Sequence, residues 1–233
     1  MQFDKDLQSI QEVRDLVSRA LVAQEEYANF SQEQVDRVVK AIADACAANA
    51  ERLAKMAVEE TGFGIWQDKV LKNLLGSTLT YESIKDLKTI GILREDREKK
   101  LMEIAVPVGV VAALIPSTNP TSTVMYKTLI SLKAGNAIII SPHPGAKNCI
   151  LETWKIINQA AMGAGAPAGL VQCVTVPSAE GTSALHGGTQ HICQHQWAQR
   201  NVGALPVQRE DHLKHRGMRT SEQGTGRQQK RGH

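Results

Sequence analysis

The chain has 233 residues, of which 42% are hydrophobic and 22% are charged, so it can bury a sizeable core in one or two domains. No apolar run reaches the roughly 18 residues of a transmembrane helix, and the amino terminus has no apolar signal core, so we expect a cytoplasmic protein without a membrane partner. From Val176 onward the chain has eight Lys and Arg and four Asp and Glu, a net charge of +4. The residues before Val176 have nineteen Lys and Arg and twenty Asp and Glu, a net charge of −1. Neither net charge indicates nucleic-acid binding.

Apolar residues at helical spacing predict two helices near the amino terminus. The first covers residues 7–30, where one face of the helix is aliphatic and aromatic. Ser31 and Gln34 have the spacing of a capping box and start the second helix. Gly62 ends that helix, because glycine readily takes the left-handed conformation just beyond a helix terminus.

A third helical region is predicted over residues 66–88. Gly76 and the polar residues beside it weaken the helical pattern, so we expect a break or two shorter pieces there. The charged run 96–100 is typical of a solvated turn, and residues 101–106 can form a strand. Residues 1–100 are therefore expected to form an amino-terminal helical region.

The strongest pattern in the chain begins at residue 103. Residues 108–115 form an apolar, β-branched run typical of a strand that is covered on both faces. The turn 116–120 follows, with two prolines around three short polar side chains that can bond a ligand or their own backbone. A helix comes next, and Thr121 or Ser122 could cap it.

A second buried strand, 137–140, runs into the polar turn 141–145. The crossover helix 148–163 and a third strand, 170–174, complete the order of a parallel βαβαβ unit, in which both turns lie at the ligand-binding edge. We therefore expect an α/β fold in which amino-terminal helices precede an incomplete nucleotide-binding sheet. Residues 101–185 would be a partial dinucleotide-binding domain, although no GxGxxG follows any strand.

Residues 186–233 differ in composition from the rest of the chain. From Leu185 on lie six of the seven histidines, with many Gln and Arg and no apolar periodicity, so we do not expect this segment to pack. A disordered basic tail is one interpretation, and a metal or nucleic-acid segment is another. His191, Cys193 and His195 lack the second ligand cluster of a metal site, so no metal is expected. We favour a third interpretation, the out-of-frame translation of a gene that continued into a folded domain.

Two segments of the chain read VPVGVVAALIPSTNPTSTVMYKTLISLKAGNAIIISPHPGAK (106–147) and GAGAPAGLVQCVT (163–175). They resemble the aldehyde dehydrogenase superfamily, and within it the CoA-acylating aldehyde dehydrogenases. A strand ending in Pro-x-x-Asn-Pro, then a helix and a strand ending in Ser-Pro-His-Pro, is narrower than any generic nucleotide-fold pattern. Non-acylating relatives usually carry an aromatic residue before the asparagine and a lysine at the position of His143. The resemblance covers residues 1–185.

The resemblance implies NAD-dependent oxidation of an aldehyde to its acyl-CoA. A cysteine thiolate attacks the aldehyde, hydride passes to a nicotinamide cofactor, and CoA takes the acyl group from the enzyme thioester. The resemblance also implies that the side-chain amide of Asn119 donates to the developing oxyanion, an interaction worth on the order of 3 kcal/mol. Without the resemblance, an Asn119 that closes an Asx turn before Pro120 is the alternative.

The resemblance further implies which residues contact the cofactor. The family positions on the cofactor side of the site correspond here to Ile115, Pro116, Ser117 and Thr118. The family positions in the loop around the adenosine ribose correspond to Ser141, Pro142 and His143. Because His143 stands where relatives have a lysine and need not hold a 2′-phosphate, NAD is expected rather than NADP. A loop histidine that bonds the backbone is the alternative for His143.

The chain departs from the family at the catalytic cysteine. In the family this cysteine lies well beyond residue 185, shortly before Ser-Glu-Gln, but Ser221-Glu222-Gln223 has no cysteine close before it, and we attribute that match to chance. The cysteines show no CxxC spacing, so reduced thiols are expected. No nucleophile is expected among Cys46, Cys149, Cys173 and Cys193. We therefore expect a truncated amino-terminal fragment without turnover.

Two hypotheses of different classes follow. The first is an acylating aldehyde dehydrogenase, truncated, with a small-molecule aldehyde and CoA as its partners. The second is a non-catalytic α/β cofactor-binding or assembly module that retains an oligomerising surface. The resemblance implies a homo-oligomer for full-length family members, and it leaves acetaldehyde, sulfoacetaldehyde and longer aldehydes open as substrates.

Overall fold

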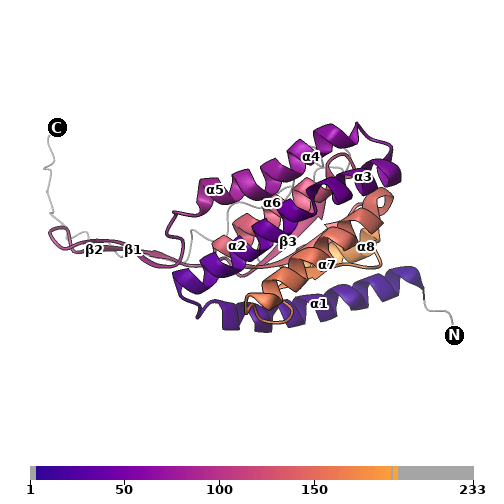
Figure 1. Ribbon diagram of the computed structural model, residues 1–233. Helices are drawn as coiled ribbons and strands as arrows, with labels where there is room; N and C mark the ends of the chain where they lie inside the picture. The colour runs from indigo at the N-terminus through magenta and orange to yellow at the C-terminus, as the bar shows by residue number, and fades with distance from the viewer. Residues whose placement is uncertain (1–3, 190, 194–233) are drawn as a thin grey trace, which may run out of the picture.

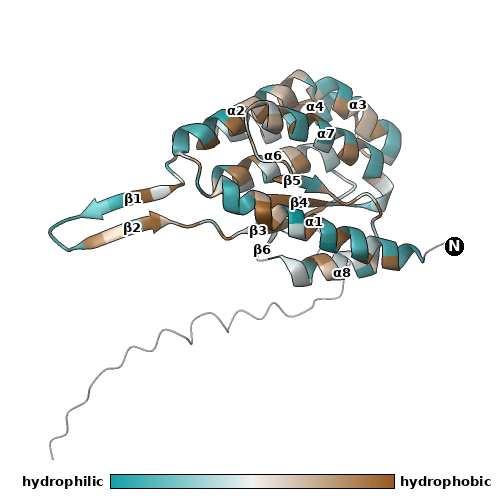
Figure 2. Cartoon of the chain, turned by 90° about the horizontal axis from the view of Figure 1, so that it is seen from below, coloured by the Kyte–Doolittle hydropathy of each residue, from teal (hydrophilic) through white to brown (hydrophobic). Residues whose placement is uncertain are grey.

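The computed structural model of the chain describes residues 4–189 and 191–193. A parallel sheet lies at the centre, with helices α2, α6 and α7 on one side and helices α1 and α8 on the other (Figure 1, Figure 2). Within these described residues, no helix has the length and apolarity needed to cross a membrane.

The amino-terminal helices begin and end close to the predicted positions. They are α1 (Lys5–Tyr27), α2 (Gln32–Ala48) and α3 (Ala50–Thr61). The predicted capping box is confirmed, because the Ser31 hydroxyl accepts from the backbone N–H of Gln34 while the Gln34 side chain accepts from that of Ser31. The second predicted helix is divided in two at Asn49, and Gly62 ends the latter part with φ of 67°.

The predicted break near Gly76 is a π-helical turn. Helix α4 (Trp66–Leu74) passes directly into the π-turn η1 (Leu75–Leu79), and α5 (Thr80–Ile84) follows. A Cβ atom on Gly76 would lie 2.6 Å from the carbonyl oxygen of Ser122, closer than real Cβ contacts. Glycine is therefore what lets this turn pack directly on the backbone of a later helix.

A two-stranded hairpin extends away from the rest of the molecule (Figure 1). Its strands are β1 (Gly91–Asp96) and β2 (Leu101–Ala105), which pair antiparallel. The predicted strand at 101–106 is therefore present, but it pairs with β1 and takes no part in the central sheet. The charged run predicted as a solvated turn lies at the exposed tip of this hairpin.

The central sheet has the strand order β5-β4-β3-β6, and all neighbouring strands are parallel. Its elements in chain order are β3 (Val110–Ile115), α6 (Pro120–Lys133), β4 (Ala137–Pro142), the short 3-10 helix η2 (Pro144–Ala146), α7 (Lys147–Gly163), β5 (Val171–Cys173), α8 (Ala179–Gly188) and β6 (His191–Cys193). The chain proceeds outward from β3 to β5 and then returns through α8 to the other side of β3. The strand order thus reverses beside β3, the place where such sheets bind ligands.

Two details of this region differ from the sequence-based expectations. Helix α6 begins at Pro120 with Asn119 as its N-cap, two or three residues earlier than a cap at Thr121 or Ser122 would allow, because proline fits the first helical turn. Regular structure also continues past the predicted boundary at residue 185, through the end of α8 and the whole of β6. Residues 194–233 of the predicted tail lie outside the described residues.

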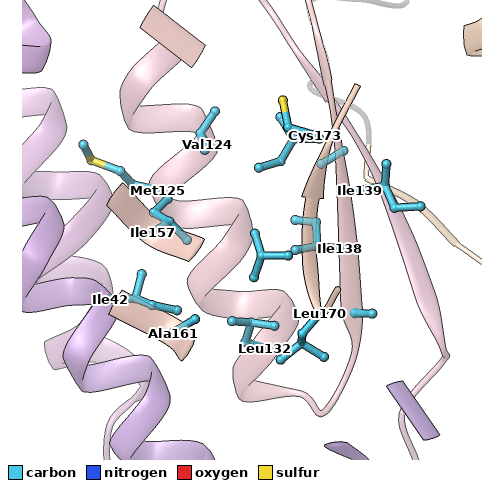
Figure 3. Packing of buried hydrophobic residues seen from close by; sticks show 14 of the residues in the cluster. Ile42, Val124, Met125, Leu132, Ile138, Ile139, Ile157, Ala161, Leu170 and Cys173 are labelled. Carbon is cyan, nitrogen blue, oxygen red and sulfur yellow. The ribbon is translucent and has the colours of Figure 1, made fainter. Parts of the chain in front are cut away.

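The core lies between the sheet and the helices on its two faces (Figure 3). Ile138 and Ile139 are adjacent on β4 and point to opposite faces of the sheet, yet both are fully buried. Ile138 faces α6, where Leu132 lies, and α7, where Ile157 lies. Helices on both faces explain why the strand sequence is continuously apolar and does not alternate.

We expect Ile138→Ala to lower the free energy of unfolding by about 2–5 kcal/mol, because it leaves a cavity between β4 and α6. Urea denaturation followed by circular dichroism measures this. The matched control is Ile92→Ala on the hairpin, where the side chain is 46% exposed and a change within about 0.5 kcal/mol is expected. Equal losses in the two variants would contradict the assignment of the core.

Candidate active site

One face of α4 holds the turn between β3 and α6. Lys69 Nζ donates to the carbonyl oxygen of Thr118 at 2.8 Å, and Lys72 Nζ donates to Oδ1 of Asn119 at 3.1 Å. The two lysines are three residues apart, so their side chains lie on the same side of the helix. Two neighbouring residues of the turn are therefore held by two neighbouring cations of α4.

Asn73 extends this contact along the same face of α4. Its side chain is buried, its Oδ1 accepts from Thr121 Oγ1 at 2.7 Å, and its Nδ2 donates to the carbonyl oxygen of Ala50 at 2.8 Å. Gly76 follows one turn later and meets the backbone of Ser122. Positions 69, 72, 73 and 76 thus form a polar stripe at helical spacing that runs along the start of α6.

Positive charge surrounds this turn. Lys69 is only 4% exposed, and burial lowers its pKa, which the nearby charge of Lys72 lowers further. From α6, the fully buried Lys127 donates from Nζ to the carbonyl oxygen of Leu114 at 2.8 Å. The carbonyl groups near the end of β3 are thus bonded by ammonium groups, which fix the backbone of the turn.

Asn119 is oriented by its contact with Lys72. An ammonium group has only donors, so the amide oxygen must face it and the amide nitrogen must point the other way. That nitrogen makes no hydrogen bond to any residue the structure describes, and the side chain makes no capping bond to α6. The Asx turn considered from the sequence is therefore not formed, and the amide N–H groups are available to a ligand.

The two predicted cofactor turns meet at the edge of the sheet. Ile115 and Pro142 are paired in the parallel register, and the backbone N–H of His143 donates to the carbonyl oxygen of Ile115 at 3.1 Å. After buried Ile115, Pro116 and Ser117 are half-buried and Thr118 is exposed. The structure thus brings together the residues that the resemblance assigns to the cofactor.

The second turn differs in how accessible its residues are. Ser141 and Pro142 are buried as the last residues of β4, whereas the His143 side chain is exposed. His143 Nδ1 accepts from the backbone N–H of Gly145 at 3.0 Å, so His143 does bond the backbone, which was the alternative considered from the sequence. A neutral imidazole that accepts at Nδ1 carries its proton on Nε2, which leaves a donor directed outward.

A groove of about 320 Å³ opens between η1 and the start of α6. Polar residues among those that line it include Lys72, Thr80, Asn119, Ser122 and Tyr126. The sequence-based reasoning missed this groove and missed the α4 residues beside it. The available signal was the polar residues at helical spacing within the third helical region, a face that would otherwise be expected to be apolar.

The described cysteines are poor nucleophiles. Cys46, Cys149 and Cys173 are buried and unpaired. Burial raises the pKa of Cys46 to about 12, and burial also raises the pKa of Cys173 and of Cys149, where Glu60 adds to the effect. The side chain of Cys193 lies outside the described residues. Over the described part of the chain, no group of three His, Cys, Asp or Glu side chains could hold a metal ion.

A parallel sheet whose order reverses beside β3, with the Asn119 amide and two polar turns at its carboxyl edge, has the architecture of dinucleotide-binding α/β domains. The sequence model of the aldehyde dehydrogenase family matches residues 6–192, and the chain belongs to this family. The match ends within β6, so it includes the helix α8 that lies on the far face of the sheet.

Individual relatives place the chain in the acylating branch of the family. It is 48% identical over 177 residues to the bifunctional aldehyde-alcohol dehydrogenase AdhE of Escherichia coli K12, a match that covers 76% of this chain and 20% of that protein. A crystal structure of a probable aldehyde dehydrogenase from Listeria monocytogenes is 62% identical with a TM-score of 0.80, covering 82% of this chain and 42% of that one. An acetylating aldehyde dehydrogenase from Geobacillus thermoglucosidasius is 51% identical, also with a TM-score of 0.80, covering 82% and 43%. The chain thus spans less than half the length of each.

We expect Asn73→Ala to lower the free energy of unfolding by about 1–3 kcal/mol, because the Ala50 carbonyl and the Thr121 hydroxyl both lose a buried partner. Chemical denaturation measures the loss. Asn148→Ala at an exposed position is the control and should change stability by less than about 0.5 kcal/mol. A neutral Asn73→Ala would show that the polar stripe of α4 does not hold α6.

The thiols of Cys46, Cys149 and Cys173 should resist alkylation by iodoacetamide at pH 8 in the native protein, because their raised pKa values and burial keep them protonated and inaccessible. Peptide mass spectrometry assigns the labelling to each cysteine. The same protein in urea is the positive control, where all of them should react. Rapid native labelling of any of the three would identify a reactive thiol.

Proposed function

We propose that this chain supplies the oxyanion donor and part of the cofactor site for NAD-dependent oxidation of an aldehyde to its acyl-CoA. The observation that carries the proposal is the amide nitrogen of Asn119, which bonds no described residue and which Lys72 orients at the carboxyl edge of the sheet. The names of similar proteins support it, since they include an acetylating aldehyde dehydrogenase and a bifunctional aldehyde-alcohol dehydrogenase. Membership of this family does not favour a non-catalytic assembly module.

Asn119 would act on the reacting oxygen of the aldehyde. As a nucleophile adds to the carbonyl carbon, negative charge builds on that oxygen, and an amide N–H already in position stabilises it without reorganising. The contact of Lys72 with the amide oxygen keeps the side chain in one orientation and polarises it toward stronger donation. Removing one such donor typically costs on the order of 3 kcal/mol in the barrier.

The residues at the sheet edge fit a dinucleotide. NAD, when bound, supplies the hydride acceptor for the oxidation. Residues Ile115 to Thr118 would line its nicotinamide side, with Ser141, Pro142 and His143 around the adenosine ribose. The outward Nε2–H of His143 suits a ribose hydroxyl, and one neutral imidazole is a weak partner for a 2′-phosphate, so we assign NAD over NADP.

The nucleophile is assigned to none of the described cysteines, because all three are buried with raised pKa values. The part of the reaction proposed for the described residues is therefore cofactor binding and oxyanion stabilisation, with CoA as the acyl acceptor in the complete reaction. A cytoplasmic location and assembly into a homo-oligomer stay predictions from the sequence.

Isothermal titration of the 233-residue chain tests the cofactor assignment. NAD should bind more tightly than NADP. The His143→Ala variant should lower the affinity for NAD by roughly 2–10-fold, because one hydrogen bond is lost. Asn119→Ala is the control, because it should leave the affinity for NAD unchanged. NADP binding as tightly as NAD would overturn the cofactor assignment, and no binding of either would overturn the proposed cofactor site.

A further inference from the structure

We propose that the groove between η1 and α6 binds the far end of a short aldehyde that carries an anionic group, a carboxylate or a sulfonate. The inference rests on the proposed function, because Asn119 at the groove would hold the reacting oxygen while Lys72 and Ser122 bind the other end. It adds the class of substrate, which family membership leaves open.

The size of the groove suits a small ligand. Its volume of about 320 Å³ lies at the lower end of the range of roughly 300–1,000 Å³ for small-molecule sites. Gly76 forms part of its wall, where η1 lies directly against the backbone of Ser122. This close approach brings the polar residues of α4 and α6 near each other and limits the length of the ligand that fits between them.

The groove presents donors and no acidic side chains. Lys72 carries three N–H groups and gives one of them to Asn119, so the others can bind a ligand. The Ser122 hydroxyl also lines the groove, whereas the hydroxyls of Thr80 and Thr123 are already bonded to backbone carbonyls. No Asp or Glu is among the residues that line it. An oxyanion in the groove can accept from Lys72 and Ser122 and meets no acidic side chain among the lining residues.

Lys72 is placed for this role before any ligand binds. Its ammonium is tethered to the Asn119 amide at 3.1 Å, so binding an anion costs less side-chain freedom than it would at an unrestrained surface lysine. Buried Lys69, which bonds the carbonyl oxygen of Thr118, places a second ammonium group behind the same turn. Leu75 supplies an apolar contact for the methylene groups between the two ends of the ligand.

The test compares a charged and a neutral probe that lack the reactive aldehyde. Isethionate, the alcohol with a sulfonate end, is titrated into ¹⁵N-labelled 233-residue chain at constant ionic strength, followed by 3-hydroxypropanoate and by neutral 1-propanol. We expect both anions to shift the amide signals of residues 72–76 and 119–123 saturably. We expect 1-propanol to bind at least about tenfold more weakly, a difference of about 1.4 kcal/mol in binding free energy. Comparing the affinities of isethionate and 3-hydroxypropanoate shows whether the groove prefers a sulfonate or a carboxylate.

Three variants assign the effect to Lys72. The Lys72→Met variant should lower the affinity for isethionate at least about tenfold. The Lys72→Arg variant should keep this affinity within about threefold, because it keeps the positive charge. Lys40→Met removes an exposed lysine of α2 that bonds Asp44 and should change nothing. Circular dichroism and urea denaturation confirm that each variant is folded.

Each outcome bears on one of the two proposals. Equal affinity for isethionate and 1-propanol, or unchanged isethionate binding in Lys72→Met, overturns the anionic substrate. NAD titration of the same samples keeps the proposed function separate, because Lys72 bonds Asn119 and none of the residues assigned to the cofactor. Retained NAD binding without anion binding contradicts only this inference, and absent NAD binding in the unaltered chain contradicts the proposed function.

Discussion

Contact between the polar face of α4 and the turn after β3 is the interaction on which the candidate active site depends. Lys69 and Lys72 each donate to one residue of the turn, and Asn73 joins α3 to α6 through its side chain. Burying Lys69 is costly unless its protons find acceptors, and the carbonyl oxygen of Thr118 provides one. Lys72 on the same face of α4 is exposed, and its bond orients Asn119.

The sheet determines where this turn lies. Helices cover both faces of the sheet, so β3 and residues 137–140 of β4 are apolar, and polar side chains begin where these two strands end. The parallel register pairs Ile115 with Pro142, and the hydrogen bond from His143 to Ile115 then joins the two turns. Strand pairing thus places the turn that holds Asn119 next to the turn that holds His143.

Elements with clear local signals were predictable from the sequence. Periodicity located the amino-terminal helices and the buried strands, and Ser31 with Gln34 located a cap, since each signal is contained within a few residues of chain. Other features depend on distant residues. The π-turn at Gly76 forms because α6 lies against it, and β2 pairs with β1 although its sequence also suits a central strand. The short segment of α8 and β6 beyond residue 185 gains its structure from α1 and β3.

The sequence by itself determined the α/β class, the two polar turns and the identities of Asn119 and His143, because strand and turn signals are local and the family motif lies within one segment. Only the tertiary structure decided what those side chains contact. Lys72 is 47 residues from Asn119 along the chain, and their hydrogen bond exists because α4 packs across the start of α6. The direction of the Asn119 amide and the polar groove beside it follow from that packing, which no pattern within a single segment encodes.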